Sequence, residues 1–139
     1  MSFKEIPLMK LSEGTVLFHP YISKNSFKNV KKVLSGRWIG QGPLVDKFEI
    51  KFKSMFGKKS QCLATGSGTD ALHLSYILAG LKKGDEVIAP LFTCTATNIP
   101  FLYMGVKIKF ADIDPETMNI SVNSVKKLIS KKTKAIICM

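Results

Sequence analysis

The segment that most constrains the fold of this chain spans residues 61–80 and reads QCLATGSGTDALHLSYILAG. Its pattern predicts a short apolar strand over 61–64, a turn of small residues over 65–68, and then an amphipathic helix. The glycines on either side of Ser67 let the backbone turn sharply and leave its amides uncovered, and the following helix adds the positive end of its dipole. This order of elements is typical of an anion site, most often one for phosphate. A tight turn that binds nothing is the alternative that this segment alone leaves open.

Two common phosphate loops are excluded by the residues around this turn. No Lys-Ser or Lys-Thr pair follows Gly68, as a nucleoside-triphosphate loop requires. The third glycine of a dinucleotide fingerprint is also missing.

The composition indicates one soluble globular domain. A chain of 139 residues with 45% hydrophobic and 22% charged residues can bury a real core. No run approaches the length of a membrane helix, and the first 14 residues, MSFKEIPLMKLSEG, lack the uninterrupted apolar region of a signal peptide. Cys62, Cys94 and Cys138 show no metal-ligand spacing, which favours buried reduced thiols in a cytoplasmic protein over disulfides or zinc and predicts no metal site.

The net charge of +11 comes almost entirely from lysine, because Arg37 is the only arginine. Readout of base edges and bidentate phosphate contacts both favour arginine. The charge therefore predicts a solvated lysine-rich surface rather than nucleic-acid binding or a membrane partner. Attraction of small anionic substrates stays open.

The remaining pattern alternates helices and strands. It predicts an irregular segment over 1–22 and a domain over 23–139. In that domain Ser23 is expected to cap a helix that ends at Gly36, and Pro43 to open a second helix. Strands are expected at 86–89, 106–111 and 133–138 with helices between them, the first of which ends at Gly105. The apolar positions of the first helix fall on one face, and the apolar stripe of the second, Leu44, Phe48, Phe52 and Met55, is expected to form core. Such alternation is typical of parallel βαβ units and hence of an α/β layered domain.

The predicted topology brings two small-residue segments to one edge of the sheet. The turn at 65–70 and the segment 90–97 are both expected to connect a strand to a helix, and ligands of parallel sheets bind at the carboxyl ends of the strands. This placement strengthens the prediction of an anion site. The last predicted strand is apolar on both faces, so we expect further helices to cover it. This suggests that the chain is the front part of a larger α/β protein.

Several blocks resemble a known family. GSGTDALHLSYILAG, KKGDEVIAPLFTCTATN, FADIDPETMNIS and TKAIIC resemble, in order and spacing, the nucleotide-sugar aminotransferases of the DegT/StrS type. The earlier LSGRWIGQGPLVDKFEIKF resembles their leader segment. The resemblance implies the N-terminal part of the large domain of a fold-type-I enzyme, the aspartate-aminotransferase fold, which has three layers around a mainly parallel sheet and binds pyridoxal 5′-phosphate (PLP).

The resemblance also implies roles for individual residues. The turn at 66–70 would hold the cofactor phosphate, chiefly through backbone amides and the Thr69 hydroxyl, with Ser67, Gly68, Thr69 and Asp70 as the binding residues. The segment with Cys94 would lie over the pyridine ring. Many members have a stacking aromatic residue where this chain has Cys94, so contact here would be van der Waals or come from a neighbour. A loop at 37–42 would lie near the substrate, with Trp38 as the binding residue. A Trp packed under its own loop is the alternative.

The resemblance implies a function as well. The family transfers an amino group, usually from glutamate, to a nucleotide-linked keto-sugar for polysaccharide or glycan synthesis, and acts as a homodimer. PLP chemistry needs a Schiff-base lysine and a carboxylate at the pyridinium nitrogen. In the family both follow the last matched strand, and none of the twenty lysines here matches that lysine. We therefore predict no catalytic residue and expect the chain to look truncated and to be inactive alone. The alternative is a non-catalytic α/β module that binds a phosphate ligand or a partner.

Other candidate residues favour structural roles. His73 lies among leucines on a predicted helix and is expected to be a structural histidine. His19 precedes Pro20 in a loop without an identifiable partner. Asp112 and Asp114 frame a turn before Pro115 and are expected to shape it rather than to bind metal.

Overall fold

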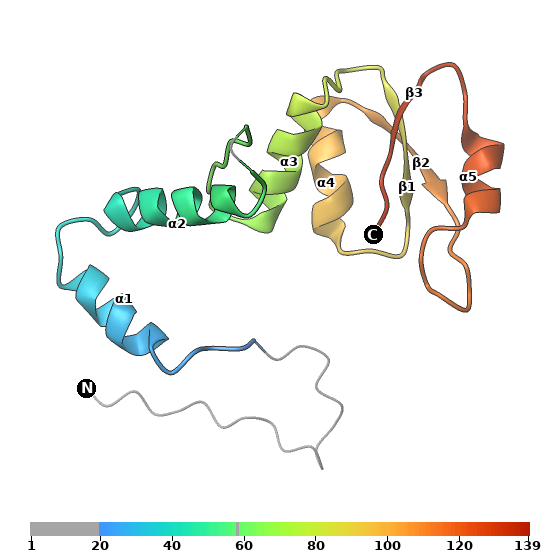
Figure 1. Ribbon diagram of the computed structural model, residues 1–139. Coiled ribbons are helices and arrows are strands. Elements are labelled where there is room, and N and C mark those ends of the chain that lie inside the picture. Colours follow the sequence, from blue (N-terminus) through green and yellow to red (C-terminus); the bar gives the residue numbers. More distant parts are fainter. Residues whose placement is uncertain (1–19, 58) are drawn as a thin grey trace, which may run out of the picture. The chain divides into compact units, whose positions relative to one another are not determined.

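The computed structural model describes residues 20–57 and 59–139 (Figure 1). These residues form two compact units, which lie within 1–51 and 52–139. Most of the irregular segment predicted over 1–22, and His19 with it, lie outside the described residues. The predicted domain boundary after residue 22 stays a prediction.

The first two helices begin close to their predicted starts. Helix α1, Ser26–Leu34, has Asn25 at its N-cap, whereas Ser23 forms the turn before it and accepts a hydrogen bond from the Asn25 amide at 3.2 Å. The prediction that Ser23 itself caps the helix is therefore wrong. Helix α2, Pro43–Ser54, opens at Pro43 as predicted, because proline suits the first helical position.

The apolar stripes of these two helices are exposed in the described chain. Phe27 and Leu34 of α1 are 76% and 62% exposed, and Leu44 and Phe48 of α2 are 57% and 55% exposed. The prediction that the α2 stripe forms a core is wrong for this structure. Burial depends on a neighbouring layer and not on periodicity, so the pattern indicates the helices correctly and their environment incorrectly.

The second unit is an α/β layer structure with a fully parallel sheet. Its elements are α3 Gly68–Leu78, β1 Glu86–Pro90, α4 Thr95–Met104, β2 Lys107–Ala111, α5 Val122–Leu128 and β3 Thr133–Ile136. The strand order is β2-β1-β3, and β1 pairs in parallel with both neighbours. Gly105 ends α4 in the left-handed conformation, with φ of 66°, which a residue without a Cβ adopts at little cost. The predicted α/β class and parallel sheet are confirmed.

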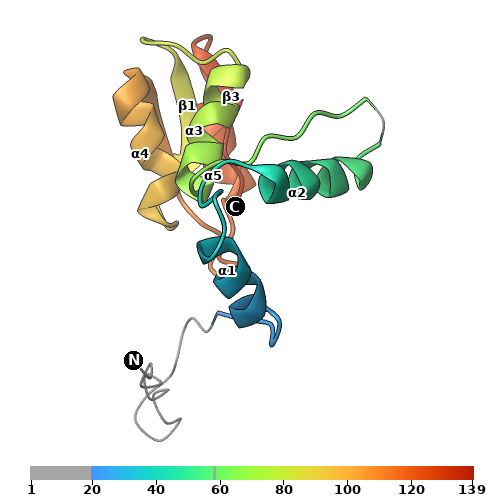
Figure 2. The same ribbon diagram turned by 90° about the vertical axis from the view of Figure 1, so that its left-hand side faces the viewer.

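The central strand β1 separates two apolar layers. Val87 is fully buried on the face covered by α3 and α4, together with Tyr76 and Phe101. Ile88, its neighbour in sequence, points to the opposite face and packs with Val125 of α5. Alternation along one strand thus builds three layers, which Figure 1 shows side by side as α3 and α4, the strands, and α5. In Figure 1 and Figure 2 alike, α3 and α4 start at the end of the unit where β1 finishes.

The segment 61–64 is not a strand in this structure. The sheet of the described residues contains β1, β2 and β3. A strand forms only where a neighbour supplies the other half of a hydrogen-bond ladder, and apolar composition cannot supply it. The turn at 65–70 therefore does not connect a strand of this sheet to a helix, although the start of α3 does lie at the expected end of the unit.

A polar cluster ties the amino end of the sheet together. Lys109 of β2 lies 2.8 Å from the Glu86 carboxylate of β1, and the Ser130 hydroxyl donates to the same oxygen at 2.7 Å. The hydrogen bonds from Lys109 and Ser130 lower the pKa of Glu86. This cluster joins β1, β2 and the turn before β3 at the end opposite to the starts of α3 and α4.

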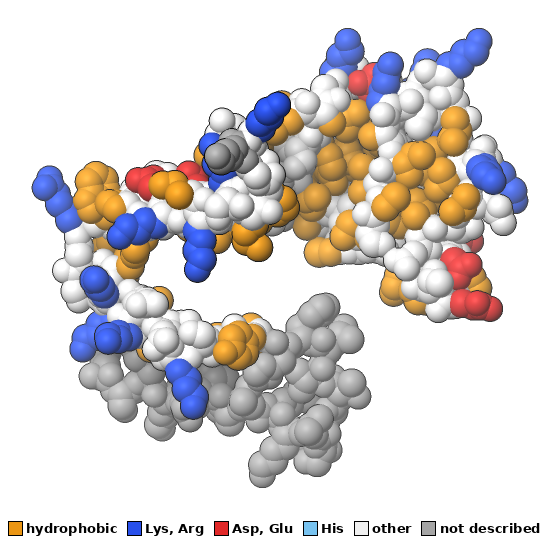
Figure 3. All heavy atoms as spheres, viewed as in Figure 1, with side chains coloured by type: hydrophobic (Ala, Val, Ile, Leu, Met, Phe, Trp, Pro, Cys, Tyr) orange, Lys and Arg blue, Asp and Glu red, His pale blue; other side chains and the backbone are white. Residues whose placement is uncertain are grey.

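The surface of the second unit separates charge from apolar area. In Figure 3 its lysine side chains stand along the rim, and apolar side chains gather over α4 and the strands. Within the described residues, no helix combines the length and apolarity needed to cross a bilayer.

Candidate functional site

The turn before α3 is built around the side chain of Ser67. Ser67 occupies the N-cap with an extended backbone, and its hydroxyl oxygen accepts a hydrogen bond from the Asp70 amide at 3.1 Å. The same hydroxyl donates to the Asp70 carboxylate at 2.9 Å, and the Thr65 hydroxyl donates to the Ser67 carbonyl at 2.9 Å. The side chains of Ser67 and Asp70 therefore satisfy each other and hold the turn closed.

The first turn of α3 leaves two amides available. The amide of Ala71 donates to the Ser67 carbonyl at 3.1 Å and that of Asp70 to the Ser67 hydroxyl. Among the described residues, the amides of Gly68 and Thr69 donate to no acceptor. They lie at the positive end of a helix dipole, so this is where an anion would be stabilised.

The space around the turn is open at Gly68 and closed at Gly66. A Cβ placed on Gly68 would meet nothing within 4 Å, whereas one on Gly66 would lie 3.0 Å from an Asp70 carboxylate oxygen. The Asp70 carboxylate thus covers the Gly66 side of the turn. An anionic group fits against Gly68 and the half-buried Thr69, and its approach from the Gly66 side is opposed by like charge.

The second segment of the site is the loop between β1 and α4. Cys94 is the N-cap of α4 and is exposed, as is Cys138, so the prediction of buried cysteines is wrong for these two residues. The Cys94 carbonyl accepts a hydrogen bond from the Thr97 amide at 3.0 Å. The Thr97 and Thr93 hydroxyls lie 3.0 Å apart, so Thr97, which is 1% exposed, is hydrogen-bonded to both Thr93 and Cys94 of the loop.

Tyr76 connects the two segments. It lies on α3 and donates a hydrogen bond from its hydroxyl to the Thr97 carbonyl at 3.1 Å. Its ring stacks on Phe101 of α4, with centroids 4.2 Å apart and an angle of 20° between the rings. Burial raises the pKa of Tyr76, so the phenol keeps its proton at neutral pH and remains a donor.

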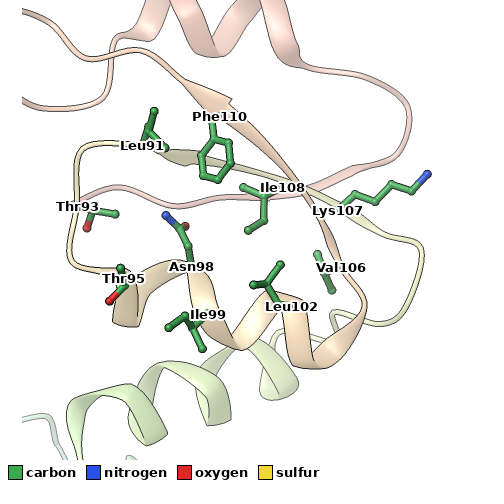
Figure 4. A pocket seen from close by; sticks show the side chains of 10 residues that line it. All are labelled: Leu91, Thr93, Thr95, Asn98, Ile99, Leu102, Val106, Lys107, Ile108 and Phe110. Carbon is green, nitrogen blue, oxygen red and sulfur yellow. The ribbon is translucent and has the colours of Figure 1, made fainter.

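A pocket of about 630 Å³ adjoins this loop between α4 and β2 (Figure 4). Asn98 lines it and donates from its side-chain nitrogen to the Pro90 carbonyl at 3.2 Å, which holds the first turns of α4 against the end of β1. The other amide atom, Oδ1 of Asn98, is buried and has no hydrogen-bond partner among the described residues.

Trp38 lies in the first unit, in the loop between α1 and α2. Its side chain is 62% exposed and borders a pocket of about 560 Å³ together with Arg37. A Cβ on Gly42 would lie 3.0 Å from the Trp38 Cβ, so the loop folds closely around the base of this side chain. The structure thus shows an exposed ring on a tightly packed loop, and a substrate role for Trp38 stays a prediction.

The comparisons with known proteins decide the family. The sequence profile of the DegT/DnrJ/EryC1/StrS aminotransferase family matches residues 20–139. This chain belongs to that family. Among curated relatives, GDP-perosamine synthase from Vibrio cholerae is 34% identical over 124 residues, which cover 88% of this chain and 34% of that protein.

Solved structures of the family have the same fold. The Escherichia coli GDP-4-keto-6-deoxy-D-mannose-3-dehydratase with bound hydrated PLP matches with a TM-score of 0.75 and 32% identity, over 88% of this chain and 33% of that chain. The PMP-form of the putative sugar aminotransferase Spr1654 from Streptococcus pneumoniae matches with a TM-score of 0.74 and 28% identity, over 86% of this chain and 30% of that chain. This chain spans about a third of the length of the curated relatives it matches.

The residues that the sequence indicated for cofactor binding lie at the starts of two neighbouring helices. The structure brings the four turn residues together at the start of α3 and places Cys94 at the start of the adjacent α4. Sequence reasoning missed Tyr76, Thr97 and Asn98. The sequence indicates Tyr76 only as part of an amphipathic helix. A signal for the other two was the pair of polar residues, Thr97 and Asn98, near the start of an otherwise apolar helix.

The structural roles expected for His73 and Asp114 stay predictions, and the structure gives the contacts of both residues. His73 is half-buried and its ring lies 6.4 Å from that of Tyr103. The Asp114 carboxylate accepts hydrogen bonds from the amides of Thr117 and Glu116, and these bonds lower its pKa. In the described part of the chain, no three His, Cys, Asp or Glu side chains gather in a way that could hold a metal.

Proposed function

We propose that this chain holds the phosphate of PLP at Gly68 and Thr69 and forms part of an aminotransferase for a nucleotide-linked keto-sugar. The observation that carries this proposal is the pair of amides without acceptors at the start of α3, in a chain of the DegT/DnrJ/EryC1/StrS family. The relatives named above with PLP or PMP support the choice of ligand.

The residues present fit a phosphate group. The amides of Gly68 and Thr69 would donate to its oxygens, and the Thr69 hydroxyl, which has no partner among the described residues, would add a third donor. Ser67 and Asp70 hold this geometry before the ligand arrives, because their side chains bond to each other. We therefore assign phosphate contact to Gly68 and Thr69 and a shaping role to Ser67 and Asp70.

The loop after β1 would face the ring of the cofactor. When bound, PLP supplies an electron sink that allows bonds to the substrate's amino-bearing carbon to be broken. The exposed Cys94 at the start of α4 would make van der Waals contact with that ring in place of an aromatic stack. The thiol is small, so this chain would hold the cofactor mainly by its phosphate.

The rest of the proposal follows from the family. The amino donor would be glutamate, the product would serve polysaccharide synthesis, and the enzyme would act as a cytoplasmic homodimer. A relative that acts in GDP-perosamine synthesis and a second in spore coat polysaccharide biosynthesis support the sugar class. Trp38 would contact the substrate.

An isotope-transfer assay tests this function. The protein with its full natural chain is incubated with PLP, ¹⁵N-glutamate and GDP-4-keto-6-deoxy-D-mannose, a sugar named in a relative. Mass spectrometry is expected to find ¹⁵N in an amino sugar nucleotide only when PLP is present. Consumption of the sugar without incorporation of ¹⁵N would show a different reaction, such as dehydration, and would contradict the assignment as an aminotransferase.

A further inference from the structure

Tyr76 lies in the last turn of α3, the helix that begins at the phosphate turn, and its hydroxyl bonds to Thr97, which follows the Cys94 loop. We propose that Tyr76 is a positioning residue whose hydroxyl sets the position of the phosphate turn relative to the Cys94 loop. This inference rests on the proposed function, because it assumes that one ligand spans the two segments.

The first step is the direction of the tyrosine side chain. Tyr76 lies two turns along α3 from Gly68, and long side chains on a helix point back toward its N-terminus. Its hydroxyl reaches the carbonyl of Thr97, in the first turn of α4, at 3.1 Å. The bond therefore joins the last turn of α3 to the first turn of α4, directly after the loop that would face the cofactor ring.

The second step is the position of Thr97. It is 1% exposed, its amide donates to the Cys94 carbonyl at 3.0 Å, and its hydroxyl lies 3.0 Å from that of Thr93. A displacement of Thr97 would therefore move Thr93 and Cys94, two adjacent residues of the loop that would face the ring. One hydrogen bond joins Tyr76 of α3 to Thr97, and two more join Thr97 to this loop.

The ring and the hydroxyl of Tyr76 have different effects on the packing of α3 against α4. Stacking of Tyr76 on Phe101 holds α3 against α4 by packing, and a phenylalanine would keep it. The hydroxyl adds a directional bond, which sets how far one helix is shifted along the other. Its removal should therefore alter the spacing between the two segments more than it weakens the fold.

Two ligands distinguish this role from a general structural one. Pyridoxamine 5′-phosphate (PMP) carries the ring and the phosphate but no aldehyde that could react with surface lysines, and inorganic phosphate occupies the turn alone. Titration of the protein with its full natural chain gives the PMP dissociation constant, and competition gives the inhibition constant of inorganic phosphate. For Tyr76→Phe, we expect PMP affinity to fall about three- to tenfold, as loss of one hydrogen bond predicts, with no change for inorganic phosphate.

Two further variants sharpen the test. Tyr103→Phe removes the hydroxyl of a 78% exposed tyrosine on α4 and is expected to behave as wild type. Thr93→Val removes the hydrogen bond between the Thr93 and Thr97 hydroxyls and is expected to reproduce the selective loss of PMP affinity. An unchanged PMP affinity in Tyr76→Phe, or an equal loss for both ligands, would overturn the inference. A wild-type protein that binds no PMP would overturn the proposed function, and the inference with it.

Discussion

Replacement of Gly68 by aspartate is expected to lower the affinity for PMP by at least about a hundredfold, because a carboxylate would stand beside a phosphate dianion. Two unit charges about 4 Å apart repel by several kcal/mol in the environment of a protein surface. The fold should survive, because a Cβ at Gly68 meets nothing within 4 Å. Aspartate also suits the first turn of a helix.

The matched control is Gly68→Asn, which has nearly the same shape without the charge. Its loss of PMP affinity should be much smaller, and the difference between the two variants isolates the electrostatic part. Titration calorimetry gives both constants, and circular dichroism checks that the helices are retained. Equal losses for the aspartate and asparagine variants would show that no anion binds beside Gly68.

Phe101→Ala is expected to reduce the free energy of unfolding of the second unit by about 3–5 kcal/mol. Phe101 is fully buried, stacks on Tyr76 and packs with Val87 of the central strand. Alanine would leave a cavity where α3, α4 and the sheet meet, and the surrounding side chains cannot all move in to fill it. Chemical denaturation followed by circular dichroism measures the change.

Leu102→Ala is the control for this prediction, since Leu102 follows Phe101 on α4 and is 68% exposed. Its effect should stay below about 1 kcal/mol, as is usual for surface positions. If both variants lowered stability equally, the side of α4 that faces the sheet would be assigned incorrectly.

Local chemistry made a large part of this structure predictable. Ser67 forms its cap through its own hydroxyl and a residue three positions away, so short-range pattern suffices to find it. Pro43 opens α2 and Gly105 closes α4 for similarly local reasons. The parallel sheet followed from the alternation of helices and strands, and the family from blocks of residues around the turn.

Features that depend on distant neighbours were not predictable. The segment 61–64 has the composition of a strand, but pairing decides whether a strand forms. The stripe with Phe27 has helical spacing, yet its burial depends on a second layer. Tyr76 and Thr97 are 21 positions apart, and nothing in either local pattern indicates that one donates to the other.

The central claim is that the turn at Gly68 and Thr69 holds the cofactor by its phosphate. The most direct measurement compares the affinities of the wild-type protein for PMP and for pyridoxamine, which differ only in that group. We predict that PMP binds more than about tenfold tighter, a difference of about 1.4 kcal/mol or more, and that inorganic phosphate displaces it. Equal affinities for PMP and pyridoxamine, with no displacement by phosphate, would contradict the claim.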